Sequence, residues 1–475
     1  MKHVTHQYFD QTVQSIVDVI RFDSSMKPAE EGCPFGKETA ECLKWFLSLA
    51  ESFGFQTKNY DNYAGEVIFG EGEPFAILAH LDVVPAGNGW IYPPFEGVIN
   101  DEPSAGGVTG RKIWGRGALD DKAPAICCLY ALKAIKDQGI VPNRKIQLIV
   151  GCNEESGWKC MQYYQSKAEL PAEGFTPDAD FPVIYAEKGI MHFTTAFPIN
   201  DAPMYALKAG TAANMVCDYA CATLHKKAAA KLVDYHNPIE GTTFSYDNTT
   251  NILQVYGKSA HGSTPHHGAN ALQALLCFLG FINDDCQNAY DLLFNDGLGL
   301  SVYEDETGKT TISPDVAYMQ DGVLKIVTDV RFPATFSLQS VIDALDASGV
   351  SYECANAQPP LFNDKEGALI STLSRVYHEA TGKDATPLAI GGGTYARALE
   401  CGCAFGPEEF GDEATIHQPN EYITLEKLAF LSEIYYDALY EISKPHYTRI
   451  GWLKVKRNKV CCESECDTEE TTDAE

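Results

Sequence analysis

The sequence predicts an α/β protein: a mostly parallel sheet flanked by helices, interrupted by an inserted α+β domain. Between about residues 64 and 187, apolar strand-like runs alternate with helical patterns. Such alternation is typical of a parallel sheet that is covered on both faces. From about 190 the pattern becomes an irregular mixture of strands and helices, and the regular alternation returns after Pro387. The chain is therefore expected to leave its first domain and later to return to it.

The first part of the chain can be divided into elements in order. Apolar residues at helical spacing, among them Val13, Ile16 and Ile20, predict the first helix. Gly54 suits the end of the second helix because glycine readily adopts the left-handed conformation found there. The expected elements are helices at 7–21 and 37–53, strands at 64–70 and 75–81, a long loop at 83–119, a helix at 122–137, a strand at 145–152, a helix at 156–167 and a strand at 182–187.

The change of pattern also predicts the domain boundaries. We expect the main domain to use residues 1–189 and 385–448, and the insert to use residues 190–384. After the insert, a short strand at 388–390 precedes three glycines, and a final helix is expected at about 425–443. The extension at 449–475 ends in 15 residues with seven acids and no base, so we expect its end to be disordered.

Composition excludes several classes of protein. The net charge of −29 disfavours nucleic acid and anionic membranes as partners. No apolar run approaches the length of a membrane span, and the first residues lack the apolar segment of a signal peptide. The 16 cysteines are scattered and form no CxxC pair, so they are expected to be reduced thiols in a cytoplasmic protein.

Chemistry-bearing residues stand where predicted strands end. His80 and Asp82 close an apolar run, and side chains two residues apart on a strand share a face. A carboxylate behind a histidine fixes the orientation of a metal-binding imidazole. Glu154 and Glu155 follow another strand, and adjacent carboxylates repel unless a positive charge or a proton lies between them. Because ligands bind at the carboxyl ends of strands in such sheets, these residues predict a metal site.

Further acids and a second histidine extend this candidate site. Asp120 lies in a glycine-rich turn before a helix, Asp178 lies in a proline-containing turn, and His417 lies in the turn Ile416–Glu421. Most of these residues have another interpretation: Asp120 suits a helix cap, the Glu154–Glu155 pair suits the solvated start of a helix, and a lone loop histidine such as His417 is often a surface residue. Only the combination favours a dinuclear metallohydrolase.

With these residues assembled, the sequence resembles the PepV-type dinuclear zinc dipeptidases, members of a clan that includes aminoacylases, carnosinases and glutamate carboxypeptidases. The resemblance runs from about residue 10 to 445. It departs modestly from the family pattern at Ala123, where glycine is usual, and at Asn153, where aspartate or threonine is common. The matching segments are 80–87, 90–95, 115–122, 153–157, 177–182, 187–189, 257–263, 270–271, 391–397 and 417–421.

The resemblance implies a zinc-peptidase-like catalytic domain, an inserted lid and a role for each site residue. Asp120 would bridge two divalent metal ions, and the Asp120–Asp121 peptide bond would be cis. Zinc is expected, although manganese and cobalt suit the same ligands. Asp82 would orient His80, and Glu154 would be the general base acting on a metal-bridged water. The two metal sites would be completed by His80 and Asp178 on one side and by Glu155 and His417 on the other.

The resemblance also assigns residues of the insert. His261 would stabilise the oxyanion, and Asn214 and Arg331 would bind substrate, Arg331 through the substrate's C-terminal carboxylate. For each of these three, a structural hydrogen bond or ion pair is the alternative. Because the insert is nearly twice the usual length of such a lid, its second half is expected to replace a partner subunit, which makes the protein a monomer.

The expected activity is hydrolysis of unblocked dipeptides, with a small-molecule substrate as the only partner. The main alternative is a deacylase of N-acyl amino acids that uses the same metals. A catalytically inactive binding protein is disfavoured because every expected ligand and the base are present.

Overall fold

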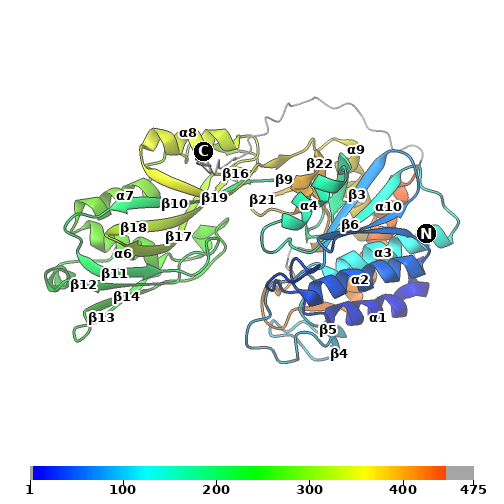
Figure 1. Cartoon of the computed structure of the whole chain (residues 1–475), viewed down its shortest axis with the longest axis horizontal. Helices are drawn as coiled ribbons and strands as arrows, with labels where there is room; N and C mark the ends of the chain where they lie inside the picture. The colour runs from blue at the N-terminus through cyan, green and yellow to red at the C-terminus, as the bar shows by residue number, and fades with distance from the viewer. Residues whose placement is uncertain (1–3, 410, 445–475) are drawn as a thin grey trace, which may run out of the picture.

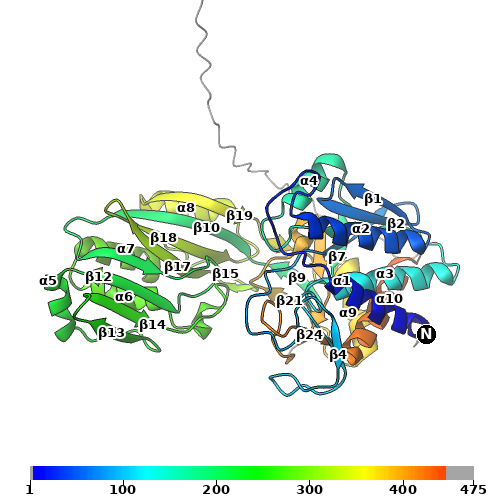
Figure 2. The same cartoon turned by 60° about the horizontal axis from the view of Figure 1, so that its bottom comes forward.

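The computed structural model describes residues 4–409 and 411–444. Two sheets, each with its own helices, lie side by side along the long axis of the molecule (Figures 1 and 2). The first sheet is built from both ends of the chain and the second from its middle. The predicted extension at 449–475 lies outside the described residues.

The first sheet has nine strands, and its centre is parallel. β3 pairs in parallel with β6 and β7, and β7 pairs in parallel with β22, whereas the pairs toward both edges are mainly antiparallel. The order is β1 (Gln56–Tyr60), β2 (Ala64–Phe69), β6 (Lys145–Gly151), β3 (Pro74–His80), β7 (Glu173–Thr176), β22 (Cys401–Ala404), β9 (Ile184–Glu187) and β20 (Leu361–Phe362), with β21 (Leu388–Ile390) beside β9.

Helices pack against this sheet and close its core. Because both faces of β3 are covered, its segment Phe75–Ala79 is continuously apolar and fully buried. α3 is buried along most of its length and packs against α10. The helices of this unit are α1 (Phe9–Ile20), α2 (Lys37–Ser52), α3 (Lys122–Asp137), α4 (Lys159–Lys167), α9 (Ala368–Thr381) and α10 (Leu425–Ile442), with 3-10 turns η1 (Thr5–Tyr8) and η4 (Tyr395–Ala398).

The second sheet is antiparallel throughout, with a separate apolar core beneath its helices. Its order is β13 (Thr243–Asp247), β14 (Ile252–Tyr256), β12 (Tyr219–Leu224), β11 (Met204–Ala209), β17 (Thr311–Gln320), β18 (Val323–Phe332), β10 (Gly189–Pro198) and β19 (Ser351–Gln358). Its helices are α5 (Lys226–Ala229), α6 (Ala271–Gly280), α7 (Asp284–Phe294) and α8 (Leu338–Ser348), with turns η2 (Ala230–Val233) and η3 (Pro265–His267).

Three small sheets complete the description. They consist of β4 (Val98–Asn100), β5 (Lys112–Trp114) and β24 (Tyr422–Thr424); β8 (Ala179–Asp180) with β23 (Pro407–Glu408); and β15 (Glu304–Asp305) with β16 (Gly308–Lys309). The first of them joins the long loop at 83–119 to the segment that follows His417. Within the described residues, no helix combines the length and the apolar character needed to cross a bilayer.

The predicted fold class, an α/β sheet flanked by helices and interrupted by an α+β insert, is confirmed. The packing of residues 361–381, however, favours an end of the insert before the expected residue 384. β20 pairs with β9, and Leu369, Leu373 and Val376 of α9 belong to the core of the first sheet. We therefore propose that the insert comprises about residues 189–358. Helical periodicity shows which face of α9 is apolar, but not which of two cores that face covers.

Candidate metal centre

The predicted metal ligands converge at one edge of the first sheet. His80 ends β3, Glu154 and Glu155 follow β6, and Asp178 follows β7. Because these three strands are parallel neighbours, their carboxyl ends lie side by side. Asp120 joins them from the turn before α3, and its peptide bond to Asp121 is cis, as expected. His417, in the left-handed conformation at φ 62°, comes from the loop before β24.

Asp120 lies between the two histidines. Its Oδ1 is 2.9 Å from Nε2 of His80, and its Oδ2 is 2.9 Å from Nε2 of His417. Asp178 Oδ2 lies 3.5 Å from the same nitrogen of His80, and Glu155 Oε1 lies 3.1 Å from that of His417. The five side chains therefore form two groups that share Asp120. Glu154 is also close: one of its oxygens lies within 4.8 Å of a ligand atom of His80 and of a ligand atom of Asp178.

The negative charges of the carboxylates in this cluster favour the binding of cations. Although burial lowers the pKa of both imidazoles, hydrogen bonds to Asp120 and its neighbours raise that of His80 well above its usual value and that of His417 to about 11. Burial and the charge of Asp120 raise the pKa of Glu155 to about 7. The carboxylates thus attract positive charge to the points where their oxygens converge. Histidine nitrogens and carboxylate oxygens fit zinc, manganese or cobalt.

Asp82 has a wider role in the site than predicted. Nδ1 of His80 lies 2.9 Å from the backbone oxygen of Asp82 and 3.6 Å from its carboxylate. The two carboxylate oxygens accept hydrogen bonds from the backbone N–H groups of Glu154, at 3.0 Å, and Glu155, at 3.1 Å. Asp82 therefore contacts His80 mainly through its backbone and also holds the turn that carries both glutamates.

The surroundings of the Glu154 carboxylate suit proton exchange. The indole N–H of Trp158 donates to its Oε1 at 3.1 Å. Burial, with the negative charges of Asp178 and Glu155, raises its pKa well above the usual value. A group that holds a proton readily in this position suits general acid–base chemistry.

Glu421 is a further buried residue of the site, and the sequence assigned it no role. Its Oε1 accepts hydrogen bonds from the backbone N–H groups of Leu119, at 2.8 Å, and Asp120, at 3.2 Å. Its Oε2 pairs with Nη1 of Arg116 at 2.7 Å, and both side chains are almost fully buried. Glu421 thus ties the Asp120 turn to the chain that follows His417. The only signal in the sequence is an acid four residues after a candidate ligand.

The predicted residues of the insert lie where the insert meets the glycine run 391–393. Ser263, two residues after His261, approaches Gly391, and Arg331 donates to the Gly391 carbonyl at 3.0 Å. Arg331 is also paired with Asp329 at 2.7 Å. Asn214 is exposed, and its backbone oxygen accepts from the N–H of Gly262 at 2.7 Å. The charge of His417 acts on His261 and lowers its pKa, after the larger effects of burial and Arg331.

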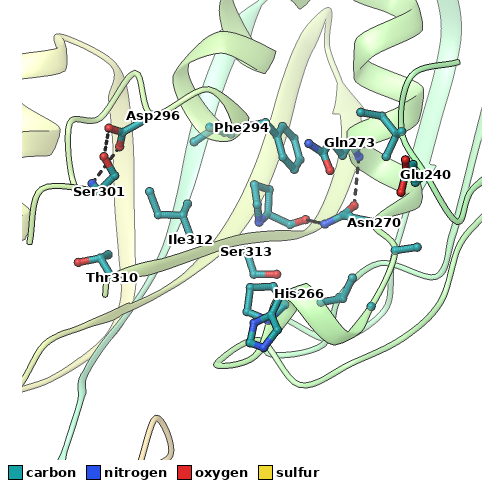
Figure 3. Close-up of a pocket in the computed structure, with 17 residues that line it drawn as sticks. Glu240, His266, Asn270, Gln273, Phe294, Asp296, Ser301, Thr310, Ile312 and Ser313 are labelled. Carbon is teal, nitrogen blue, oxygen red and sulfur yellow. Dashed lines mark hydrogen bonds between the residues drawn. The ribbon is translucent and has the colours of Figure 1, made fainter. Parts of the chain in front are cut away.

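The insert also contains a cavity of about 410 Å³ (Figure 3). It is lined by insert residues such as Glu240, Gln273, Phe294 and Ser313, and by Asn270, which donates to the backbone oxygen of Pro314. The predicted metal ligands and His261 are not among the described residues that line it. The candidate metal centre is therefore recognised by its donor atoms and not by a cavity.

A cluster of nitrogen and oxygen donors at the carboxyl edge of an α/β sheet, with a half-buried glutamate beside it, is typical of metal-dependent hydrolases. Residues 76–441 match the family described as Peptidase family M20/M25/M40. A Staphylococcus epidermidis protein, named provisionally as a dipeptidase, is 33% identical over 92% of this chain and 98% of its own length. The chain belongs to this peptidase family and is a metallopeptidase, which confirms the resemblance.

Solved structures share the fold. Human carnosine dipeptidase 1 matches 92% of this chain and 97% of its own, with a TM-score of 0.56 and 12% identity. The dipeptidase Dug1p from Saccharomyces cerevisiae matches 93% of this chain and 98% of its own, with a TM-score of 0.56 and 14% identity. At these identities the likeness concerns the fold alone.

Proposed function

We propose that the protein is a dinuclear dipeptidase that hydrolyses the peptide bond of unblocked dipeptides. The observation that carries the proposal is Asp120, whose two carboxylate oxygens each lie 2.9 Å from the Nε2 of a different histidine. A carboxylate in this position can bridge two ions. His80 and Asp178 would complete one ion site, and Glu155 and His417 would complete the other. The names of the relatives and of the structural neighbours support a dipeptide as substrate.

The chain's own residues would divide the chemistry among them. Two divalent ions, with zinc as the proposed metal, would supply an acidified water and a polarised carbonyl when bound. Glu154 would take the proton of the attacking water and return it to the leaving nitrogen. The half-buried position of its carboxylate, its raised pKa and the contact with Trp158 suit that exchange. His261 would donate a hydrogen bond to the oxyanion as it forms.

Substrate binding is proposed for Asn214 and Arg331. Arg331 uses Nε and one N–H of Nη2 for Asp329 and one N–H of Nη1 for the Gly391 carbonyl. Because a guanidinium carries five N–H groups, two remain for a substrate carboxylate. Asp329 would hold the guanidinium in place for that contact.

The substrate class can be tested with matched substrates. We would incubate zinc-loaded and manganese-loaded protein with alanyl, methionyl and β-alanyl dipeptides and with their N-acetyl counterparts. Cleavage of only the free-amine set supports the dipeptidase. Cleavage of only the acetylated set would instead assign the protein to the deacylases of N-acyl amino acids. Cleavage of neither set by metal-loaded protein would contradict both.

Removal of the metals should abolish hydrolysis and lower the melting temperature. The carboxylates around Asp120 lose the positive charge that balances them, and bound ions stabilise only the folded state. Activity and thermal unfolding would be measured after dialysis against a chelator and again after stoichiometric zinc. A chelated protein that keeps full activity, with no metal found by elemental analysis, would contradict the metal site.

We also propose that one chain completes its own site. His261 and Arg331 belong to the insert, yet their surroundings include Gly391 and His417 of the same chain. This supports a monomer. No disulfide joins two cysteines within the described residues, which supports a reducing compartment such as the cytoplasm.

A further inference from the structure

The loop that carries His261 is held by backbone hydrogen bonds on both sides of the histidine. The N–H of Val216 donates to the Ala260 oxygen at 2.9 Å, and the N–H of Gly262 donates to the Asn214 oxygen at 2.7 Å. Lys258 and Ala269 close the base of the loop with two hydrogen bonds, at 2.9 and 2.8 Å. The backbone of His261 is therefore fixed relative to the second sheet. These hydrogen bonds do not determine the orientation or the tautomer of its side chain.

Ser263 makes two contacts with one nitrogen of that side chain. Its Oγ lies 2.7 Å from Nδ1 of His261, and its backbone N–H donates to the same nitrogen at 3.2 Å. A backbone N–H can only donate, so Nδ1 must accept with its lone pair. In a neutral imidazole the proton is then on Nε2. The arrangement selects one of the two neutral tautomers.

The surroundings of His261 favour the neutral ring. His261 is partly exposed, but the burial of the rest of its ring and the positive charge of Arg331 lower its pKa. The other charged groups that act on it are Asp329, which opposes this shift, and His417, which adds to it. A neutral imidazole whose Nδ1 is occupied has one donor left, the N–H at Nε2.

Ser263 also lies close to the first glycine of the run 391–393. A Cβ added to Gly391 would lie 2.7 Å from the Cβ of Ser263, closer than real side-chain atoms approach. The first glycine of the run 391–393 therefore leaves the space that Ser263 occupies. The carbonyl of this glycine accepts from Arg331 at 3.0 Å, so the same residue contacts two insert residues of the site.

We propose that Ser263 is a positioning residue, whose hydroxyl and backbone N–H hold His261 in the Nε2–H tautomer with that N–H free for the developing oxyanion. The inference deepens the proposed function and rests on it for the oxyanion. It assigns Ser263 no contact with substrate. Its effect should therefore appear in the chemical step and not in substrate binding.

The tautomer can be measured without any substrate. Full-length, zinc-loaded protein labelled with ¹⁵N-histidine would be examined by long-range ¹H–¹⁵N NMR, with His261→Gln identifying the His261 signals. We expect the Nε2–H pattern in the unchanged protein. An Nδ1–H or doubly protonated pattern at neutral pH would overturn the inference, whatever the substrate proves to be.

Kinetics test the hydroxyl on whichever substrate set is cleaved. Ser263→Ala should lower kcat about tenfold, the rate equivalent of one ordinary hydrogen bond, and change KM less than about twofold. Ser263→Thr keeps a hydroxyl and should recover most of the rate. Ser259→Ala, on the same loop but outside the contact with Nδ1, is the matched control and should have no effect.

Two kinetic outcomes would reject a positioning role. One is a Ser263→Ala enzyme with unchanged kcat, and the other is a loss confined to KM. Gly391→Ala provides a second variant, because its methyl group displaces Ser263 from the other side and should reproduce the loss in kcat. If neither substrate set is cleaved, the proposed function fails and the NMR pattern alone decides the inference.

Discussion

Replacing Glu154 with glutamine should lower kcat about 10²- to 10⁴-fold while the protein stays folded and binds metal. Glutamine keeps the size of the side chain and can still accept from the indole of Trp158, which donates at 3.1 Å to Oε1. It cannot take a proton from water. The five proposed metal ligands and the carboxylate of Asp82, which holds the Glu154–Glu155 turn, are unchanged. Steady-state kinetics on a cleaved dipeptide would measure the loss.

The control separates loss of the base from loss of the metals. Metal content by elemental analysis and the melting temperature should match those of the unchanged protein. Glu51→Gln, at an exposed position on α2, should leave all three measurements unaffected. If the Glu154→Gln enzyme kept at least a tenth of the normal kcat, this would contradict the assignment of Glu154 as the general base.

Replacing Glu421 with alanine should lower the free energy of unfolding by about 3–5 kcal/mol. The change leaves the guanidinium of Arg116 buried without its carboxylate partner, which lies 2.7 Å away. It also removes the acceptor for the N–H groups of Leu119 and Asp120. Since these N–H groups belong to the turn of Asp120, the proposed bridging ligand, metal affinity should fall as well. Urea unfolding of the metal-free protein measures the first effect, and zinc titration measures the second.

An exposed ion pair provides the comparison. Lys365 and Glu306 form a salt bridge with both side chains more than a third exposed. Glu306→Ala should therefore cost no more than about 1 kcal/mol and leave zinc binding unchanged. Equal losses for Glu421→Ala and Glu306→Ala would show that the buried pair with Arg116 contributes no more than a surface contact.

Local patterns in the sequence determined the centre of the fold and the candidate ligands. The apolar run before His80 and the one before Glu154 are long enough to predict buried strands, and both strands are present as β3 and β6. The rule that ligands gather at the carboxyl ends of such strands then placed both residues at one edge. Strands with weaker local signals, such as β1 and β7, were missed. The exposed, polar β1 gains its order by pairing with β2, not from its own periodicity.

Only the tertiary structure decided which partners the site residues have. The carboxylate of Asp82 accepts from N–H groups more than 70 residues away, Glu421 pairs with a distant Arg116, and Ser263 fills the space that Gly391 leaves. The structure also decided that α9 packs in the first core. Sequence periodicity reports which face of an element is apolar and where the element ends. Hydrogen bonds and close packing depend on segments that meet only when the chain folds. For this reason only the tertiary structure shows how the residues of the candidate metal centre are held in place.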